Sequence, residues 1–386
     1  MTTTVLIFVA HYLPGWKYGG PIRTIANLVE HLGEDFDFRI VTSDRDYGDP
    51  VTYPGIKVDQ WQEVGQALVC YVSPDQRGLR SLARLMRETP HDLLYINSFF
   101  NPIFTIRPLL ARRIGLALLR PCVIATRGEF AKGALELKAW KKKLYLLAAP
   151  TSGLYFGLRW QASSDSEADD IRRVLPNVAQ DVYVARNLPA LSPVLEPRHA
   201  AVCGDAPLNV VFLARLTRMK NLEFALEVLS ECPLLVKFDI WGTKEDETYW
   251  RTCERKIAAM PANIQVCYRG VAEHICVPKI LSDYDLLFLP TIGENYGHVI
   301  AEALSVGTPV LISDRTPWRQ LTEEGVGWDL PLQNGKRLFI QALEEAFRKR
   351  NTEGGSWNER VRLYALGRLS DPSTVEANRR LLSPGS

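Results

Sequence analysis

The chain has 386 residues, more than one ordinary hydrophobic core organises, so two domains of roughly 150–200 residues each are expected. Hydrophobic residues make up 46% and charged residues 23% of the chain, a balance that excludes a disordered or fibrous protein. The net charge is only +2, but residues 77–143 hold fourteen Lys and Arg against four Asp and Glu. This local excess favours an anionic partner such as a membrane surface, a polyprenyl phosphate or an acidic glycan. No nucleic-acid motif accompanies it.

The first apolar run, 5–10, is too short for the core of a signal peptide and has no basic residue before it. We expect it to be a buried first strand. No stretch holds 18 uninterrupted apolar residues, so no membrane-spanning helix is expected. The seven cysteines include no C-x-x-C pair, so we expect reduced thiols in the cytoplasm rather than disulfides or a zinc site.

Strand-like runs alternate with helix-like segments, the pattern of an α/β protein with parallel sheets. The expected strands of the first half are 5–10, 37–42, 92–97, 122–126 and part of 155–163, with helices at 21–32 and 78–88. Three prolines within 189–197 predict an extended linker near 187–197. The expected strands of the second half are 210–213, 236–241, 264–268, 286–290 and 310–313, with helices at 222–229 and from Lys336 onward.

These patterns predict two domains, 1–190 and 200–370, followed by a last segment, 371–386. We expect the helix of this last segment to pack back on the first domain. No G-x-G-x-x-G sequence occurs, which disfavours a dinucleotide-dependent oxidoreductase. No P-loop sequence occurs either, which excludes a P-loop NTPase.

The most informative segment is 291–314, which begins just after a predicted strand. A helix is expected at about 297–305. Open α/β sheets bind ligands at the carboxyl ends of their strands, and the start of a helix suits a phosphate. Glu294 and Glu302 are eight residues apart, and carboxylates accept hydrogen bonds from sugar hydroxyls. If Glu294 only capped the helix and Glu302 were an ordinary helix carboxylate, the sequence would look the same.

Two other loops follow predicted strands. Arg215, Arg218 and Lys220 come after the strand 210–213, where basic side chains suit a diphosphate, although plain surface charge would look the same. Gly19 and Gly20 follow the first strand and permit close approach of the backbone to a ligand, although Gly-Gly-Pro also forms ordinary turns.

Together these segments resemble the family 4 (GT4) group of retaining glycosyltransferases. That family has the GT-B fold, in which two Rossmann-like domains face each other across a cleft. Order and spacing agree from Val5 to about Leu330. The matching motifs are Gly19-Gly20 for the glycine loop, Arg215-x4-Lys220 for the basic pair and Glu294-x7-Glu302 for the E-x7-E motif.

The resemblance implies transfer of a hexosyl unit from a nucleoside diphosphate sugar to an acceptor hydroxyl, with retention of configuration. It implies that Arg215 and Lys220 hold the diphosphate, that Glu294 contacts the sugar, and that Glu302 binds the ribose. Arg215, Lys220 and Glu294 are the implied catalytic residues. The implied donor-binding residues are Gly19, Gly20, Arg215, Lys220, Glu294, Asn295, Tyr296, Gly297, His298, Val299 and Glu302.

The first domain departs from the family pattern, because many members carry a histidine near the ends of its strands. This chain has Asn97, Arg127 and Glu129 there, which suggests that these three residues line the acceptor side. His11 and His298 remain, and a structural role is favoured for both over acid–base catalysis.

No carboxylate is an obvious nucleophile for a double displacement, so we favour a front-face transfer in which the leaving phosphate helps to take the acceptor proton. No cofactor and no metal are expected beyond the nucleotide sugar, because Arg and Lys can neutralise the diphosphate. The two D-x-D matches, 44–46 and 283–285, are as many as chance gives.

The default donor is UDP-glucose, and the expected acceptor is a glycan or lipid-linked glycan of bacterial cell-surface polysaccharide assembly. Trp140 beside three lysines fits peripheral contact with an anionic membrane at its cytoplasmic face. A nucleotide-sugar epimerase and a non-catalytic sugar-nucleotide binding protein on the same fold are the alternatives.

Overall fold

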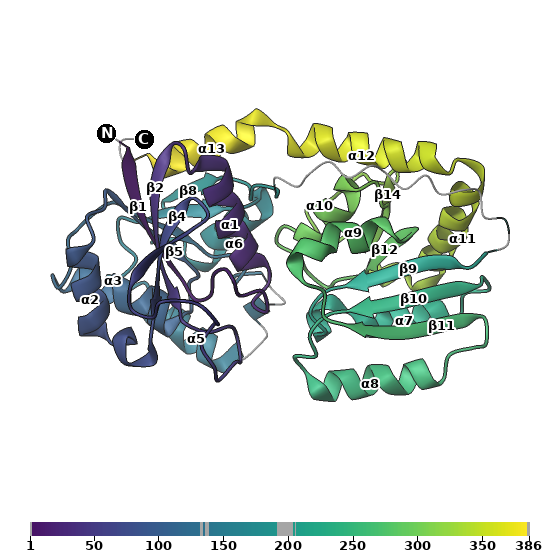
Figure 1. Ribbon diagram of the computed structural model, residues 1–386, viewed down its shortest axis with the longest axis horizontal. Helices are drawn as coiled ribbons and strands as arrows, with labels where there is room; N and C mark the ends of the chain where they lie inside the picture. Colours follow the sequence, from purple (N-terminus) through teal and green to yellow (C-terminus); the bar gives the residue numbers. More distant parts are fainter. Residues whose placement is uncertain (1, 132–133, 136–138, 191–203, 205, 384–386) are drawn as a thin grey trace. The chain divides into compact units, whose positions relative to one another are not determined.

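The computed structural model describes residues 2–131, 134–135, 139–190, 204 and 206–383. It divides into two compact units, residues 1–191 with 371–386 and residues 192–370 (Figure 1). Most of the predicted linker, from 191 onward, lies outside the described residues. Among the residues described, no helix has both the length and the apolar character needed to cross a bilayer.

The described part of the first unit is built on an eight-stranded sheet. Neighbouring strands run parallel except for β3 and β4, which form an antiparallel hairpin. The strands in sheet order are β3 (Trp61–Val64), β4 (Ala67–Val72), β2 (Phe36–Ser43), β1 (Thr3–Val9), β5 (Leu93–Asn97), β6 (Cys122–Ala125), β7 (Arg159–Ala162) and β8 (Asp181–Val184). The central strands β1 and β5 are apolar almost throughout because helices cover both faces of a parallel sheet.

Six α-helices within the described residues belong to this unit. They are α1 (Gly20–Leu32), α2 (Leu79–Glu88), α3 (Arg107–Arg113), α5 (Ala139–Ala148), α6 (Asp165–Val174) and α13 (Pro372–Leu382). Helix α13 comes from the far end of the chain and packs beside α1, with Leu381 and Leu382 buried in the core of the first unit. Asn378 of α13 also donates a hydrogen bond to the carbonyl oxygen of Arg186 at 2.8 Å.

The second unit holds a six-stranded parallel sheet. Its strands in sheet order are β11 (Ile264–Gly270), β10 (Val236–Trp241), β9 (Leu208–Leu213), β12 (Leu286–Leu289), β13 (Val310–Ser313) and β14 (Gly327–Leu330). Its helices are α7 (Leu222–Ser230), α8 (Glu247–Ala258), α9 (Val277–Ser282), α10 (His298–Ser305), α11 (Lys336–Thr352) and α12 (Gly355–Leu369). Numbered along the chain, the strand order is 3-2-1-4-5-6, that of a Rossmann fold.

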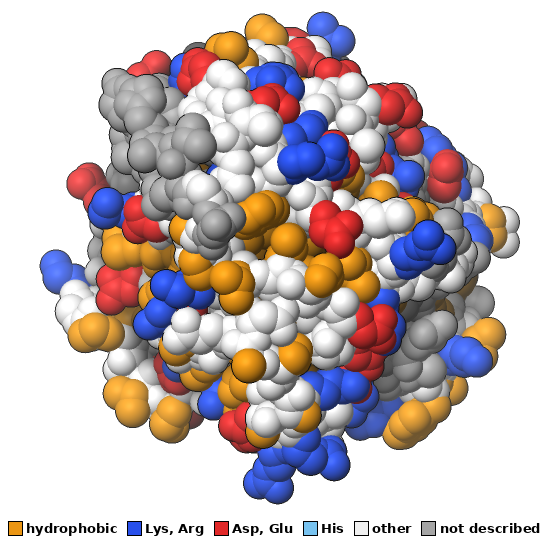
Figure 2. Space-filling model, turned by 90° about the vertical axis from the view of Figure 1, so that its right-hand side faces the viewer, with side chains coloured by type: hydrophobic (Ala, Val, Ile, Leu, Met, Phe, Trp, Pro, Cys, Tyr) orange, Lys and Arg blue, Asp and Glu red, His pale blue; other side chains and the backbone are white. Residues whose placement is uncertain are grey.

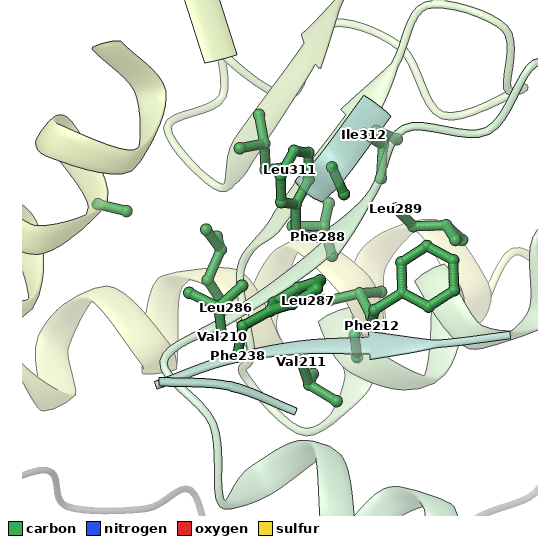
Figure 3. Packing of buried hydrophobic residues seen from close by; sticks show 14 of the residues in the cluster. Val210, Val211, Phe212, Phe238, Leu286, Leu287, Phe288, Leu289, Leu311 and Ile312 are labelled. Atoms are coloured by element: carbon green, nitrogen blue, oxygen red, sulfur yellow. The ribbon is translucent and has the colours of Figure 1, made fainter. Parts of the chain in front are cut away.

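The core of the second unit lies on the central strands of this sheet. Figure 3 shows apolar side chains of β9, β10, β12 and β13 packed against one another, with Phe212, Phe238 and Phe288 among them. Each of these three rings is fully buried. Truncating one such ring costs about 3–5 kcal/mol of folding free energy. The strands are therefore firmly packed, and they hold the loops that follow them in fixed positions.

The expected strands and helices are present, but β3, β4, β8 and β14 were not predicted from the sequence. β3 and β8 lie at the edges of the first sheet, and exposed and half-buried residues alternate along both. A four-residue edge strand carries too few buried positions to give a clear hydrophobic pattern.

A buried ion pair joins α11 to the central strands of the second unit. Arg350 pairs with Asp285 at 3.2 Å, and their side chains are 6% and 7% exposed. Arg350 also donates to the carbonyl oxygens of Ala206 and Pro207, both at 2.8 Å. The second D-x-D match thus contains an aspartate that is already bound to a cation of the protein.

We expect Arg350→Leu to lower the free energy of unfolding of the second unit by about 3–5 kcal/mol, because Asp285 would stay buried without its cationic partner. Urea unfolding measures the change. Arg348→Leu, at an exposed position of the same helix, is the control and should change it by about 0.5 kcal/mol or less. Equal losses in the two variants would contradict the role of the ion pair.

Candidate functional site

The loops after β9 and β12 meet at the point where the strand order of the second sheet reverses. From β9 the chain moves to β10 on one side, whereas from β12 it moves to β13 on the other. The connecting segments therefore diverge and leave the carboxyl ends of β9 and β12 accessible to a ligand. The basic segment 214–221 follows β9, and the segment 290–297 follows β12.

Hydrogen bonds join these two loops. The Ile292 N–H and the Thr291 hydroxyl both donate to the Met219 carbonyl oxygen, at 2.8 and 2.9 Å. Asn221, in the left-handed region with φ 60°, donates from its side chain to the Pro290 carbonyl oxygen at 2.9 Å. The positions of Lys220 and Glu294 relative to each other are thus fixed through the backbone.

Lys220 and Glu294 form an ion pair between these loops, and each side chain is 16% exposed. The Glu294 N–H donates to the Arg315 carbonyl oxygen at 3.0 Å, which ties the loop to the end of β13. Lys220 is the last residue of a short 3-10 turn that leads into α7. The sequence predicted separate contacts for these residues with phosphate and sugar, and the structure brings the two side chains into direct contact.

Arg215 lies on the other side of the basic loop and contacts the loop that follows β10. Its Nη1 donates to both carboxylate oxygens of Glu245, at 3.1 and 3.2 Å. Gly242 makes this approach possible, because a Cβ there would lie 1.8 Å from the Ala214 carbonyl oxygen. A glycine is therefore required where the two loops cross.

Helix α10 begins directly after Glu294-Asn295-Tyr296. Its cap residue, Gly297, has a φ of 79° and no side chain to cap the helix. The start of a helix presents backbone N–H groups and a partial positive charge, which suit an anion. Tyr296 is held by its carbonyl oxygen, which accepts a 2.7 Å hydrogen bond from the Trp318 indole.

His298, Val299 and Glu302 belong to the first turns of α10, and Glu302 is buried with an exposure of 8%. The predicted donor-binding residues from Arg215 to Glu302 therefore all lie at the carboxyl edge of one sheet. Their roles in donor binding stay predictions.

Gly19 and Gly20 belong to the first unit, after β1. Gly19 has a φ of 72° and caps α1, which begins at Gly20 and has a proline in its first turn. This positive φ strongly favours glycine. The two residues lie at a corresponding place in the first sheet, because β1 lies between β2 and β5 as β9 lies between β10 and β12.

The three predicted acceptor residues take part in hydrogen bonds within the first unit. Arg127 donates to Asn97 Oδ1 at 2.5 Å and to Asn187 Oδ1 at 2.7 Å. Both Glu129 oxygens accept hydrogen bonds, from the Ser98 hydroxyl at 2.8 Å and from two backbone N–H groups of the loop after β5. Burial raises the pKa of Glu129, and these hydrogen bonds oppose the rise. The three residues thus stabilise the loops after β5 and β6.

His11 is held in place after β1. Its Nδ1 lies 3.0 Å from the Arg45 carbonyl oxygen, and its ring lies against Tyr18 and Tyr47. Burial lowers the pKa of His11, an effect that the hydrogen bond to Arg45 partly offsets.

Asp44 and Asp46, the first D-x-D match, are both bound by donors of the protein. Asp44 pairs with Arg45 and Arg77, at 2.9 and 2.7 Å, and Asp46 accepts the Trp16 N–H at 2.8 Å. Across the described ranges, no three or more His, Cys, Asp and Glu side chains are grouped to hold a metal ion. The six cysteines placed in those ranges are free thiols, and Cys203 lies outside them.

The acidic partners of the basic loop and the residue that supports the loop after β6 were not predicted from the sequence. Glu245 and Asp246 follow β10, so they lie at the same edge of the sheet as Lys220. Their position directly after a predicted strand was the signal in the sequence that could have indicated this contact. Glu167 of α6 is buried and accepts hydrogen bonds from Thr126 and Gly128, at 2.8 and 2.5 Å. Nothing in the sequence around Glu167 indicates that contact, because it spans about forty residues.

The family described as "Glycosyl transferases group 1" matches residues 204–349, which lie in the second unit. The crystal structure of Anabaena HepE in complex with UDP-glucose has a TM-score of 0.68 to this chain at 16% identity, over 98% of both chains. Sucrose-phosphate synthase from Thermosynechococcus elongatus has a TM-score of 0.72 at 15% identity, over 99% of both. WaaG, a glycosyltransferase involved in lipopolysaccharide biosynthesis, has 0.66 at 13%, over 98% of both. No curated protein matches in sequence.

These likenesses confirm the predicted fold class, two Rossmann-like α/β units of the GT-B type. The family match to the second unit supports glycosyl transfer. It lies on the segment that contains Arg215, Lys220, Glu294 and Glu302, so its position agrees with the motifs read from the sequence.

We expect Gly297→Ala to destabilise the second unit more than Gly325→Ala does. Both glycines have positive φ, 79° and 68°, which alone costs a non-glycine residue about 1–2 kcal/mol. At position 297 the new Cβ would also lie 2.8 Å from Ile300 Cδ1 and 3.2 Å from Glu294 Cγ, whereas at 325 it meets Arg360 at 3.4 Å. Urea unfolding compares the two variants. Equal losses would show that Ile300 and Glu294 move aside at no cost.

Proposed function

We propose that this protein is a retaining glycosyltransferase of family 4 that moves a hexosyl unit from a nucleoside diphosphate sugar to an acceptor hydroxyl. The contact between Lys220 and Glu294 at the reversal of strand order carries the proposal, because it joins a phosphate-binding cation to a sugar-binding carboxylate. UDP-glucose is the default donor, supported by its presence in the HepE structure, which shares the fold. The proposed acceptor is a glycan or lipid-linked glycan of cell-surface polysaccharide assembly.

The proposed reaction breaks the bond between the anomeric carbon and the diphosphate oxygen, and the electron pair leaves with the diphosphate. The acceptor oxygen forms the new bond on the same face of the sugar, and its proton passes to the departing phosphate. Lys220, Arg215 and the start of α10 stabilise the charge that develops on the diphosphate, while Glu294 accepts hydrogen bonds from sugar hydroxyls. Charge stabilisation of this kind by fixed groups is the largest contribution in many enzymes.

We expect Lys220→Ala to lower kcat about 10²–10³-fold, because one of the cations that stabilise the leaving diphosphate is lost. Turnover is measured with UDP-, GDP-, ADP- and TDP-sugars, with and without EDTA. Lys237→Ala, at an exposed position of β10, is the control and should keep normal turnover.

Near-normal turnover of Lys220→Ala would contradict the assignment. Strict loss of activity in EDTA would contradict a metal-independent mechanism. Free nucleotide or an epimerised sugar formed without acceptor would favour the epimerase, and donor binding without turnover would favour a binding protein.

We propose in addition that the enzyme works in the cytoplasm and binds peripherally to an anionic membrane through α5. Trp140, Leu144 and Leu147 recur at helical spacing and are 69%, 64% and 76% exposed. Exposed Lys141 and Lys143 flank this apolar stripe, and Lys141 lies 5.4 Å from the Trp140 ring. An apolar helix face bordered by lysines suits the interface of an anionic bilayer. By contrast, basic and acidic side chains are interspersed on the face drawn in Figure 2.

We expect the protein to co-sediment with phosphatidylglycerol vesicles at low ionic strength, and added salt should weaken the binding. The variant Leu144→Ser with Leu147→Ser should bind at least about 100-fold more weakly, because each leucine buried in the bilayer contributes about 1.5–3 kcal/mol. Leu363→Ser, at a 56% exposed leucine of α12, is the control and should bind as the wild type does. Equal binding of all three proteins would remove the support for α5 as the contact.

A further inference from the structure

Every cation of the basic loop after β9 has a carboxylate partner on a neighbouring loop. The pairs are Arg215 with Glu245, Arg218 with Asp246 and Lys220 with Glu294. Two of the three acidic residues, Glu245 and Asp246, belong to the loop after β10 and lie outside the motifs read from the sequence. The positive charge available to a diphosphate is therefore already balanced by acidic groups of the protein.

The three carboxylates differ in what else they do. Asp246 caps α8 by accepting the Tyr249 N–H at 2.9 Å, and it lies 3.7 Å from Arg218. Glu294 belongs to the proposed sugar contact. The side-chain hydrogen bonds of Glu245 within the described part of the chain all come from Arg215. Glu245 is therefore the carboxylate whose surroundings point to a single task, neutralising Arg215.

The pair of Arg215 and Glu245 is partly exposed, with 41% and 21% of the two side chains accessible, so solvent and a ligand can reach it. A partly exposed ion pair is weak, since water competes for both charges. A diphosphate carries more charge than one carboxylate and presents several oxygens to a guanidinium. It can therefore displace Glu245 from Arg215, although the carboxylate opposes its binding.

We propose that Glu245 is an internal competitor of the donor, a carboxylate that occupies Arg215 and must be displaced by the diphosphate. This inference rests on the proposed function, because it takes Arg215 as part of the diphosphate site. Glu245 would then lower the affinity for every phosphate ligand and favour release of the nucleoside diphosphate product. A ligand with a single phosphate, which contacts fewer of these cations, would bind most weakly.

The sign of the effect separates this role from a purely structural one. If Glu245 served only to position Arg215, its removal would weaken binding of the diphosphate. If Glu245 competes with the ligand, its removal strengthens binding. Glu245→Gln keeps the size of the side chain and removes the charge, so the loop after β10 can keep its shape.

The experiment measures the Kd of UDP, GDP, ADP and inorganic pyrophosphate by calorimetry for the full chain and for Glu245→Gln. We expect the Kd of the ligands that bind to fall by about three- to fivefold, the upper part of the range that one partly exposed ion pair contributes. Glu247→Gln, which removes the same charge at an exposed position two residues further on, is the control and should leave Kd unchanged. In an Arg215→Gln background, Glu245→Gln should have no effect.

An unchanged or higher Kd in Glu245→Gln, with normal binding by the wild type, would overturn this inference and leave the proposed function in place. Tightening of equal size in Glu247→Gln would overturn it as well, because the effect would then be one of net charge. If none of the four ligands binds the wild type or the variant, the diphosphate site itself is refuted, and the proposed function fails together with this inference.

Discussion

The reversal of strand order between β9 and β12 is the constraint on which the second unit's site depends. Parallel strands place all their carboxyl ends at one edge, and connections that leave in opposite directions keep that edge open. Residues 74 positions apart, Lys220 and Glu294, come into contact for this reason. The buried apolar residues of the strands beneath them hold the two loops at a fixed spacing. The positions of the charged side chains are therefore set by the loops that carry them.

The electrostatics of this edge combine opposite charges at close range. A cluster of three cations without partners would repel itself and destabilise the unit, and the paired carboxylates remove that cost. The same carboxylates compete with any anionic ligand for those cations. The carboxylates therefore stabilise the site but lower its affinity for a diphosphate. The exposure of each ion pair determines how readily a ligand displaces its carboxylate.

The corresponding edge of the first unit's sheet differs in how its polar side chains are hydrogen-bonded. There the polar residues after β5 and β6 are bound to one another and to the backbone, with Glu167 buried and Glu129 half-buried among donors. Such a network fixes the loops, and a role of Asn97, Arg127 and Glu129 at the acceptor stays a prediction. The features of this unit that stay exposed include the apolar stripe of α5, at Trp140, Leu144 and Leu147, where a membrane contact is proposed.

The sequence by itself determined the alternation of strands and helices, the two-part organisation and the loops that follow β1, β9 and β12. Those features are local, since a buried parallel strand is a continuous apolar run and a loop is marked by glycine and charge. The tertiary structure alone decided which distant charges meet. Glu245 reaches Arg215 only because Gly242 lets the two loops cross. Such contacts depend on sheet order and packing, and a single sequence carries no record of which distant segments become neighbours.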